Sequence, residues 1–160
     1  MLSSHRLAFI FLAAGTLSLA LYAADPYPPA ANAPADLKHA QDLARSSGKT
    51  LMVIFGGNWC PDCRVLHQRL EESPVKEYVE QHFVVVGINI GEYDANLPIA
   101  DSLGVTLKKG VPAAGFYGPD GKVVGITSQG ELEAARGYDA QQILTFLHKV
   151  VEQRLIEKPK

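Results

Sequence analysis

The chain has 160 residues, of which 47% are hydrophobic and 20% are charged, and its formal net charge at pH 7 is -2. This length allows one domain with a real hydrophobic core. The slight negative charge leaves no basic surplus for nucleic acid or for an anionic membrane surface, so we expect neither as a partner.

The first 24 residues have the pattern of a secretory signal peptide. Arg6 supplies a positive charge, residues 7–21 are almost wholly apolar, and the small residues Ala23 and Ala24 follow. Removal after either alanine predicts export, to the periplasm if the source is bacterial. The alternative is a retained membrane anchor through residues 7–24, although the apolar run is short for a span.

The next stretches predict a tether, a helix and a strand. Residues 25–35 are rich in Pro and Ala and lack apolar periodicity, so we expect an extended tether without a chemical role. Residues 36–47 place Leu and Ala at helical spacing and end at Gly48, which predicts an amphipathic helix. The apolar run Thr50–Phe55 predicts a buried strand, and the folded domain is expected to span residues 36–156.

Two cysteines separated by two residues follow this strand after a Gly-Gly break. Pro61 directly follows Cys60, and proline is favoured at the first helical position, so we expect a helix from Cys60 to about Glu72. A helix N-terminus stabilises an anion, which makes the Cys60 thiolate the expected nucleophile. Cys63 lies within disulfide range on the buried face of the helix, so we expect one exposed and one shielded sulfur. Such a pair suits dithiol exchange, in which the outer thiolate attacks a disulfide and the inner thiol resolves the mixed disulfide.

Other uses of the two cysteines are weaker or remain open. A structural disulfide has most effect when it closes a long loop, and this pair closes almost none. His67 can share a helix face with Cys60 and Cys63, so a non-catalytic copper or zinc binding module stays open as a function of another class. A closed metal site normally needs a fourth ligand and the sequence nominates none, so we expect neither a metal nor a cofactor beyond the disulfide.

Asp62, between the two cysteines, has two interpretations. An acid in the first turn stabilises the helix N-terminus, which could be its whole role. Its negative charge also lies near Cys60 and should raise the pKa of that thiol. Pro61 has the opposite effect, because it starts the helix whose N-terminus lowers this pKa. A less stabilised thiolate favours a reductant over a strong oxidant.

The remaining elements predict an α/β fold with a mixed sheet. Ser73-Pro74 should interrupt the helix, and residues 83–90 are apolar throughout, which predicts a strand buried on both faces. The other expected elements are helices at 75–82, 97–103 and 140–154 and a hairpin of strands 113–117 and 122–127. Residues 128–138 have no assignable pattern, although they could form a loop near the cysteines.

The order of these motifs resembles the thioredoxin superfamily over residues 37–153. The resemblance is carried by Trp59-Cys60-Pro61-Asp62-Cys63 after a hydrophobic strand and by Val111-Pro112 before a later apolar run. It implies a thioredoxin fold, with a central mixed β-sheet flanked by helices on both faces, and thiol-disulfide oxidoreductase activity. It also implies a cis Pro112 packed against the cysteines.

The same resemblance implies a binding groove shaped by Trp59, Val111 and Pro112, in which a client protein pairs with the Val111 backbone as an added strand. Thioredoxins usually carry a buried acid six residues before the first cysteine. That position is Ile54 here, so Cys63 would lose its proton to water, to Asp62 or to the departing client thiolate.

Together these patterns predict an extracytoplasmic, monomeric oxidoreductase that reduces disulfide-containing client proteins. A disulfide isomerase or an oxidant of the same fold is the alternative, because both use the same two sulfurs. A reductant outside the cytosol needs electrons, which by family resemblance would come from a membrane thiol carrier.

Overall fold

The computed structural model describes residues 25–156, so the predicted signal peptide, residues 1–24, lies outside the described part. Its elements alternate as the sequence predicts. In chain order they are the 3₁₀ helix η1 (Ala30–Asn32), α1 (Ala33–Ser47), β1 (Thr50–Gly56), α2 (Pro61–Leu70), α3 (Val75–His82), β2 (Phe83–Asn89), α4 (Leu97–Ser102), β3 (Ala113–Tyr117), β4 (Val123–Ile126), the 3₁₀ helix η2 (Ala135–Gly137) and α5 (Ala140–Ile156).

The four strands form one mixed sheet in the order β2-β1-β3-β4. β1 pairs with β2 in parallel and with β3 antiparallel, and β3 pairs with β4 antiparallel. The α2–α3 crossover makes the parallel pairing possible, while the Gly118–Gly121 turn makes the hairpin. Every residue of β1 is buried, so the strand that leads to the cysteines runs through the centre of the molecule.

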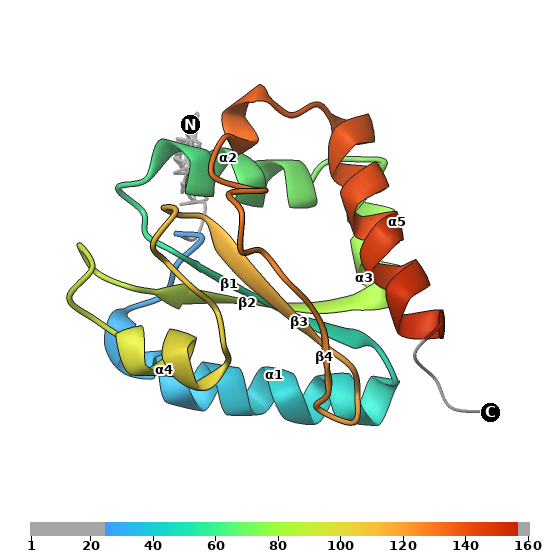
Figure 1. Ribbon diagram of the computed structural model, residues 1–160, viewed down its shortest axis with the longest axis horizontal. Helices are drawn as coiled ribbons and strands as arrows, with labels where there is room; N and C mark the ends of the chain where they lie inside the picture. Colours follow the sequence, from blue (N-terminus) through green and yellow to red (C-terminus); the bar gives the residue numbers. More distant parts are fainter. Residues whose placement is uncertain (1–24, 157–160) are drawn as a thin grey trace, which may run out of the picture.

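Helices cover both faces of this sheet, as expected. Figure 1 shows α1 and α4 on one side and α2, α3 and α5 on the other. Leu66 on α2, Val75 on α3 and Leu147 on α5 are fully buried in the same core as Phe55 of β1. The break predicted at Ser73-Pro74, after the helix that follows Cys60, is confirmed, because α2 ends at Leu70 and α3 begins after Pro74.

The expectation that the second strand is buried on both faces is wrong. β2 lies at the edge of the sheet, and its burial alternates between core and partly exposed positions. Val85 is 38% exposed. The apolar run therefore reflects one packed face together with an apolar surface, and periodicity alone could not distinguish the two.

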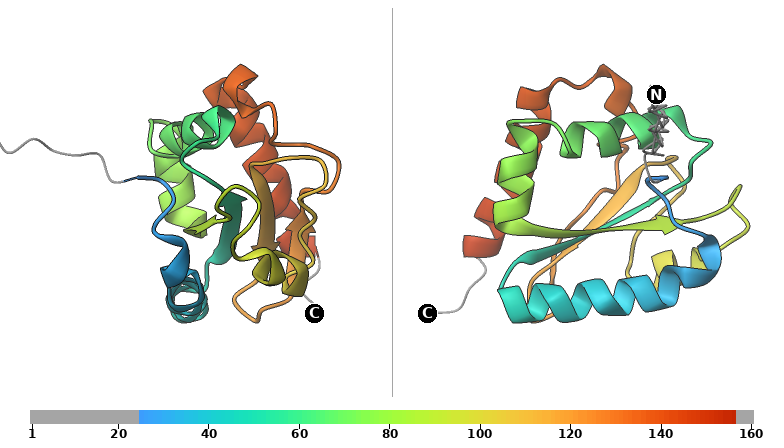
Figure 2. Two further views of the ribbon diagram at one scale, coloured as in Figure 1. Left: turned by 90° about the vertical axis from the view of Figure 1, so that its left-hand side faces the viewer. Right: turned by 180° about the vertical axis from the view of Figure 1, so that it is seen from behind.

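The expectation of an extended tether at residues 25–35 is also wrong in the structure. Tyr27 is only 3% exposed and belongs to the hydrophobic core, and η1 and the first turn of α1 occupy residues 30–35. Figure 2 shows the N-terminal segment, in blue, passing the end of β2 before α1 begins. A single tyrosine anchors this segment, so no apolar periodicity reveals the packing.

None of the helices within residues 25–156 is both long and apolar enough to span a bilayer.

Candidate active site

The two cysteines lie where β1 joins α2, and they form a disulfide with Cα atoms 5.2 Å apart. Cys60 is the N-cap of α2 with an extended backbone, and Pro61 is the first helical residue, as predicted. The backbone N–H of Cys63 donates to the Cys60 sulfur over 3.2 Å. This N–H has no carbonyl partner within the helix, so it is free to stabilise the negative charge that the Cys60 sulfur would carry as a thiolate.

Both sulfur-bearing residues are buried in the disulfide form, with Cys60 4% and Cys63 0% exposed. The sequence predicted one exposed and one shielded sulfur, and this expectation is wrong for the disulfide form, because the fold buries Cys60 as well as Cys63. The neighbouring Trp59, in contrast, is 45% exposed. Its indole N–H donates to the carbonyl of Gly91 over 2.6 Å, which fixes the ring beside Tyr93.

The Val111-Pro112 peptide bond is cis, and it lies against the disulfide. The carbonyl oxygen of Val111 is 3.5 Å from the Cys60 sulfur, and β3 begins at the next residue after Pro112. The fold thus brings together residues that are about fifty positions apart in the sequence. All three residues predicted to shape the groove, Trp59, Val111 and Pro112, border the cysteines in sequence or in space.

Asp62 has a partner that the sequence did not indicate. Its carboxylate accepts a hydrogen bond from the backbone N–H of Arg136 and forms an ion pair with the Arg136 guanidinium, each over 3.0 Å. Arg136 belongs to η2, in the segment 128–138 that had no assignable pattern. That segment therefore packs beside the start of α2, and only the tertiary fold reveals that a positive charge faces Asp62.

Ile54, the position where the sequence lacks the acid expected of thioredoxins, is buried. It is 5% exposed on β1. The fold also brings the hydroxyl of Tyr27, on the segment expected to be a tether, toward the resolving sulfur. A Cβ atom built on Gly56 would meet the Tyr27 hydroxyl oxygen at 2.6 Å and the Cys63 sulfur at 2.8 Å.

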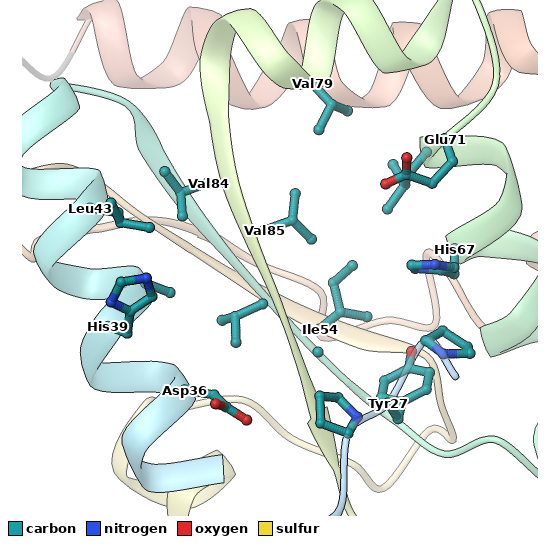
Figure 3. A pocket seen from close by; sticks show the side chains of 16 residues that line it. Tyr27, Asp36, His39, Leu43, Ile54, His67, Glu71, Val79, Val84 and Val85 are labelled. Atoms are coloured by element: carbon teal, nitrogen blue, oxygen red, sulfur yellow. The ribbon is translucent and has the colours of Figure 1, made fainter. Parts of the chain in front are cut away.

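A cavity of about 350 Å³, lined in part by Tyr27, lies between α1, α2 and the edge strand β2. Figure 3 shows His67 and Tyr27 at one end and His39 on α1 across from them. His67 therefore borders this cavity. Within residues 25–156, no three His, Cys, Asp or Glu side chains gather as a metal site would need, and the two cysteines are bonded to each other.

The fold and site agree with three comparisons. A family model described as thioredoxin-like matches residues 32–119. A crystal structure described as disulphide isomerase from Xylella fastidiosa Temecula1 is 35% identical and covers 79% of this chain and 96% of its own, with a TM-score of 0.75. A thioredoxin from Thermus thermophilus, 24% identical, has the same fold with a TM-score of 0.52 over 78% of this chain and 85% of its own.

A curated relative from Oryza sativa subsp. japonica, described as probable nucleoredoxin 3, is 32% identical over 96 residues. These residues are 48% of this chain and 20% of the relative, so the chain spans about a fifth of that protein's length. The family model matches more than half of the chain. The chain therefore belongs to the thioredoxin-like family, and its Cys60–Cys63 disulfide is that of a thiol-disulfide oxidoreductase.

Proposed function

We propose that the protein reduces disulfides of client proteins outside the cytosol, by dithiol exchange through Cys60 and Cys63. The observation that carries this proposal is the Cys60–Cys63 disulfide at the N-terminus of α2, beside the Val111 carbonyl. The helix N-terminus favours the thiolate, and the backbone carbonyl offers a place for a client strand.

The reaction starts from the dithiol form. The Cys60 thiolate attacks one sulfur of the client disulfide, and the other client sulfur leaves as a thiolate that takes a proton from solvent. Cys63 then loses its proton and attacks the Cys60 sulfur of the mixed disulfide. This step restores the Cys60–Cys63 bond and releases the client's second thiolate, so two electrons have passed to the client.

Three groups position the client in this proposal. The Val111 carbonyl, 3.5 Å from the Cys60 sulfur, accepts a backbone N–H from an extended client segment. Pro112 supports that backbone beside the sulfurs, and the exposed ring of Trp59 offers an apolar contact next to them. A client thus binds mainly through its backbone, which suits an enzyme with many different clients.

The reductive direction and the location rest on the sequence. Asp62 places a negative charge near Cys60, which disfavours the thiolate and so the reduced protein. Residues 1–24 have a signal-peptide pattern, and a reductant exported in this way would receive electrons from a membrane thiol carrier. We propose that it acts as a monomer.

Disulfide isomerisation is the second candidate, because the 35% identical structure from Xylella fastidiosa is described as a disulphide isomerase. The two activities differ in the fate of the mixed disulfide. A reductase resolves it with Cys63, whereas an isomerase lets another client thiol displace Cys60, and so retains activity without Cys63.

The test therefore compares wild type, Cys60→Ser and Cys63→Ser in two assays. The first measures complete reduction of a disulfide protein by pre-reduced protein in a single turnover with no other thiol present, and the second measures recovery of a protein with scrambled disulfides. The proposal expects wild type to be active in the first assay and both variants to be inactive in it. Recovery of the scrambled protein by Cys63→Ser at the wild-type rate would favour the isomerase instead.

A further inference from the structure

The site described above contains no group that stabilises the thiolate of the resolving cysteine, Cys63. Cys63 must become a thiolate before it can attack the mixed disulfide, and it is fully buried, where desolvation disfavours the charged form. Ile54, the position on β1 where the family resemblance would place an acid, is apolar and buried. A group that stabilises the Cys63 thiolate must therefore come from elsewhere in the fold.

The structure brings the hydroxyl of Tyr27 to that position. The hydroxyl oxygen and the Cys63 sulfur approach the same point on Gly56, since a Cβ there would lie 2.6 Å from one and 2.8 Å from the other. Position 56 therefore needs a glycine, because any larger residue would push the hydroxyl and the sulfur away. The disulfide now holds this sulfur toward Cys60, and its opening leaves the sulfur free to turn toward the hydroxyl.

Tyr27 is held in place from both sides. The side chain of Asn58 accepts a hydrogen bond from the Tyr27 backbone N–H over 3.1 Å and donates one to the Tyr27 carbonyl over 2.9 Å. Asn58 lies in the loop that leads to Cys60, so the segment carrying Tyr27 is fastened to the active-site loop itself. The ring is 3% exposed, and further along the segment the Pro28 carbonyl accepts a hydrogen bond from Asn89 on β2.

We propose that Tyr27 is a positioning residue for the resolution step, whose hydroxyl donates a hydrogen bond to the Cys63 thiolate. This inference rests on the proposed function. During resolution Cys63 gives its proton to solvent, Tyr27 keeps its own, and the stabilised thiolate attacks the Cys60 sulfur and expels the client thiolate.

Two observations support a donating hydroxyl. Burial raises the pKa of Tyr27 far above its ordinary value, so the hydroxyl keeps its proton at every working pH. Within residues 25–156 no protein group accepts a hydrogen bond from it, whereas the hydroxyls of Tyr117 and Tyr138 donate to backbone carbonyls. The donor is therefore available for a sulfur anion that forms only after reduction.

The test is the reaction of reduced protein with excess dithiobis(nitrobenzoate), followed by stopped-flow absorbance. Attack by Cys60 releases a first thionitrobenzoate at a rate that depends on reagent concentration. Resolution by Cys63 releases the second at a rate that does not. We expect Tyr27→Phe to leave the first phase unchanged, to raise the pH midpoint of the second by about one unit, and to slow it up to about tenfold at neutral pH.

Tyr117→Phe is the matched control, because it removes another buried tyrosine hydroxyl that donates to Leu103 rather than facing a sulfur. It should leave the pH midpoint of the second phase unchanged. An unchanged midpoint in Tyr27→Phe would overturn the inference and leave the proposed function standing. Absence of both phases in wild type would overturn the proposed function itself.

A second measurement needs no change at Tyr27, should Tyr27→Phe not fold. In Cys60→Ser protein carrying ¹³Cζ-labelled tyrosine, one tyrosine resonance should titrate with the midpoint that thiolate absorbance gives for Cys63. A spectrum in which no tyrosine follows the Cys63 titration would contradict the inference.

Discussion

The ion pair between Asp62 and Arg136 gives the sharpest prediction about the redox chemistry. Asp62→Ala removes an anion near Cys60, which stabilises the thiolate, lowers the Cys60 pKa and makes the protein more oxidising. Arg136→Gln leaves the Asp62 carboxylate without its partner, so the effect of this substitution on the Cys60 pKa should have the opposite sign. The Cys60 pKa should rise and the protein should become more reducing.

An order of magnitude follows from Coulomb's law for two groups in the same helical turn. Two charges about 6–7 Å apart at an effective dielectric constant of about 40 interact by about 1.3 kcal/mol, or about one pKa unit. The Arg136 guanidinium, 3.0 Å from the Asp62 carboxylate, cancels a large part of that field. Each substitution removes one of the two fields and leaves the other, so we expect Asp62→Ala to lower the Cys60 pKa by up to about one unit, or about 30 mV in the reduction potential, and Arg136→Gln to raise it by a smaller amount.

The assay is thiolate absorbance against pH for the Cys60 pKa, with equilibration in a glutathione buffer for the potential. Arg45→Gln is the control, because Arg45 is an exposed arginine that pairs with Asp42 on α1, away from the sulfurs. It should change neither quantity. A Cys60 pKa that falls in Arg136→Gln, or that moves in the same direction in Arg136→Gln and Asp62→Ala, would refute the electrostatic reasoning.

Three further predictions concern the cysteines, the groove and the stability of the fold. Cys63→Ser should accumulate mixed disulfides with client proteins on non-reducing gels, and Cys60→Ser should not. Equal trapping by both variants would contradict the assignment of Cys60 as nucleophile and Cys63 as resolving thiol. In the Cys63→Ser background, Pro112→Thr should slow release of the trapped client by an added thiol, while the melting temperature stays close to that of Cys63→Ser. A variant that unfolds without a change in client release would show that Pro112 has only a structural role. Burial and the nearby charge of His148 lower the pKa of His82, so the folded state resists its protonation, and unfolding free energy should fall as the pH drops from about 6.5. His82→Gln should flatten that slope in denaturant titrations, and an unchanged slope would show that other groups cause it.

The centre of the fold could be predicted because its signals are local. β1 is a continuous buried apolar run, Pro61 marks the helix start beside Cys60, and the Gly-Pro-Asp-Gly turn marks the hairpin. The pairing of Val111 with the cysteines came from family resemblance, because no local pattern connects residues fifty positions apart. The cis Val111-Pro112 bond confirms what the resemblance implied.

Two of the missed features, the burial of Tyr27 and the partner of Asp62, depend on contacts between distant segments. Tyr27 is one aromatic residue in a Pro/Ala-rich stretch, and its burial depends on a glycine at 56 and on the side chain of Asn58. Arg136 lies in a segment with no sequence periodicity, so nothing in the sequence pairs it with Asp62. Such contacts carry no repeating pattern, and they are the ones that adapt a common fold to particular chemistry.

The reduction potential of the Cys60–Cys63 pair tests the central claim most directly. Reduced and oxidised protein are equilibrated with a dithiol buffer of known potential, and the two forms are separated after thiol alkylation. Reductive exchange predicts a potential near that of thioredoxin, about -270 mV. A potential near that of a strong oxidant, about -120 mV, would contradict the account.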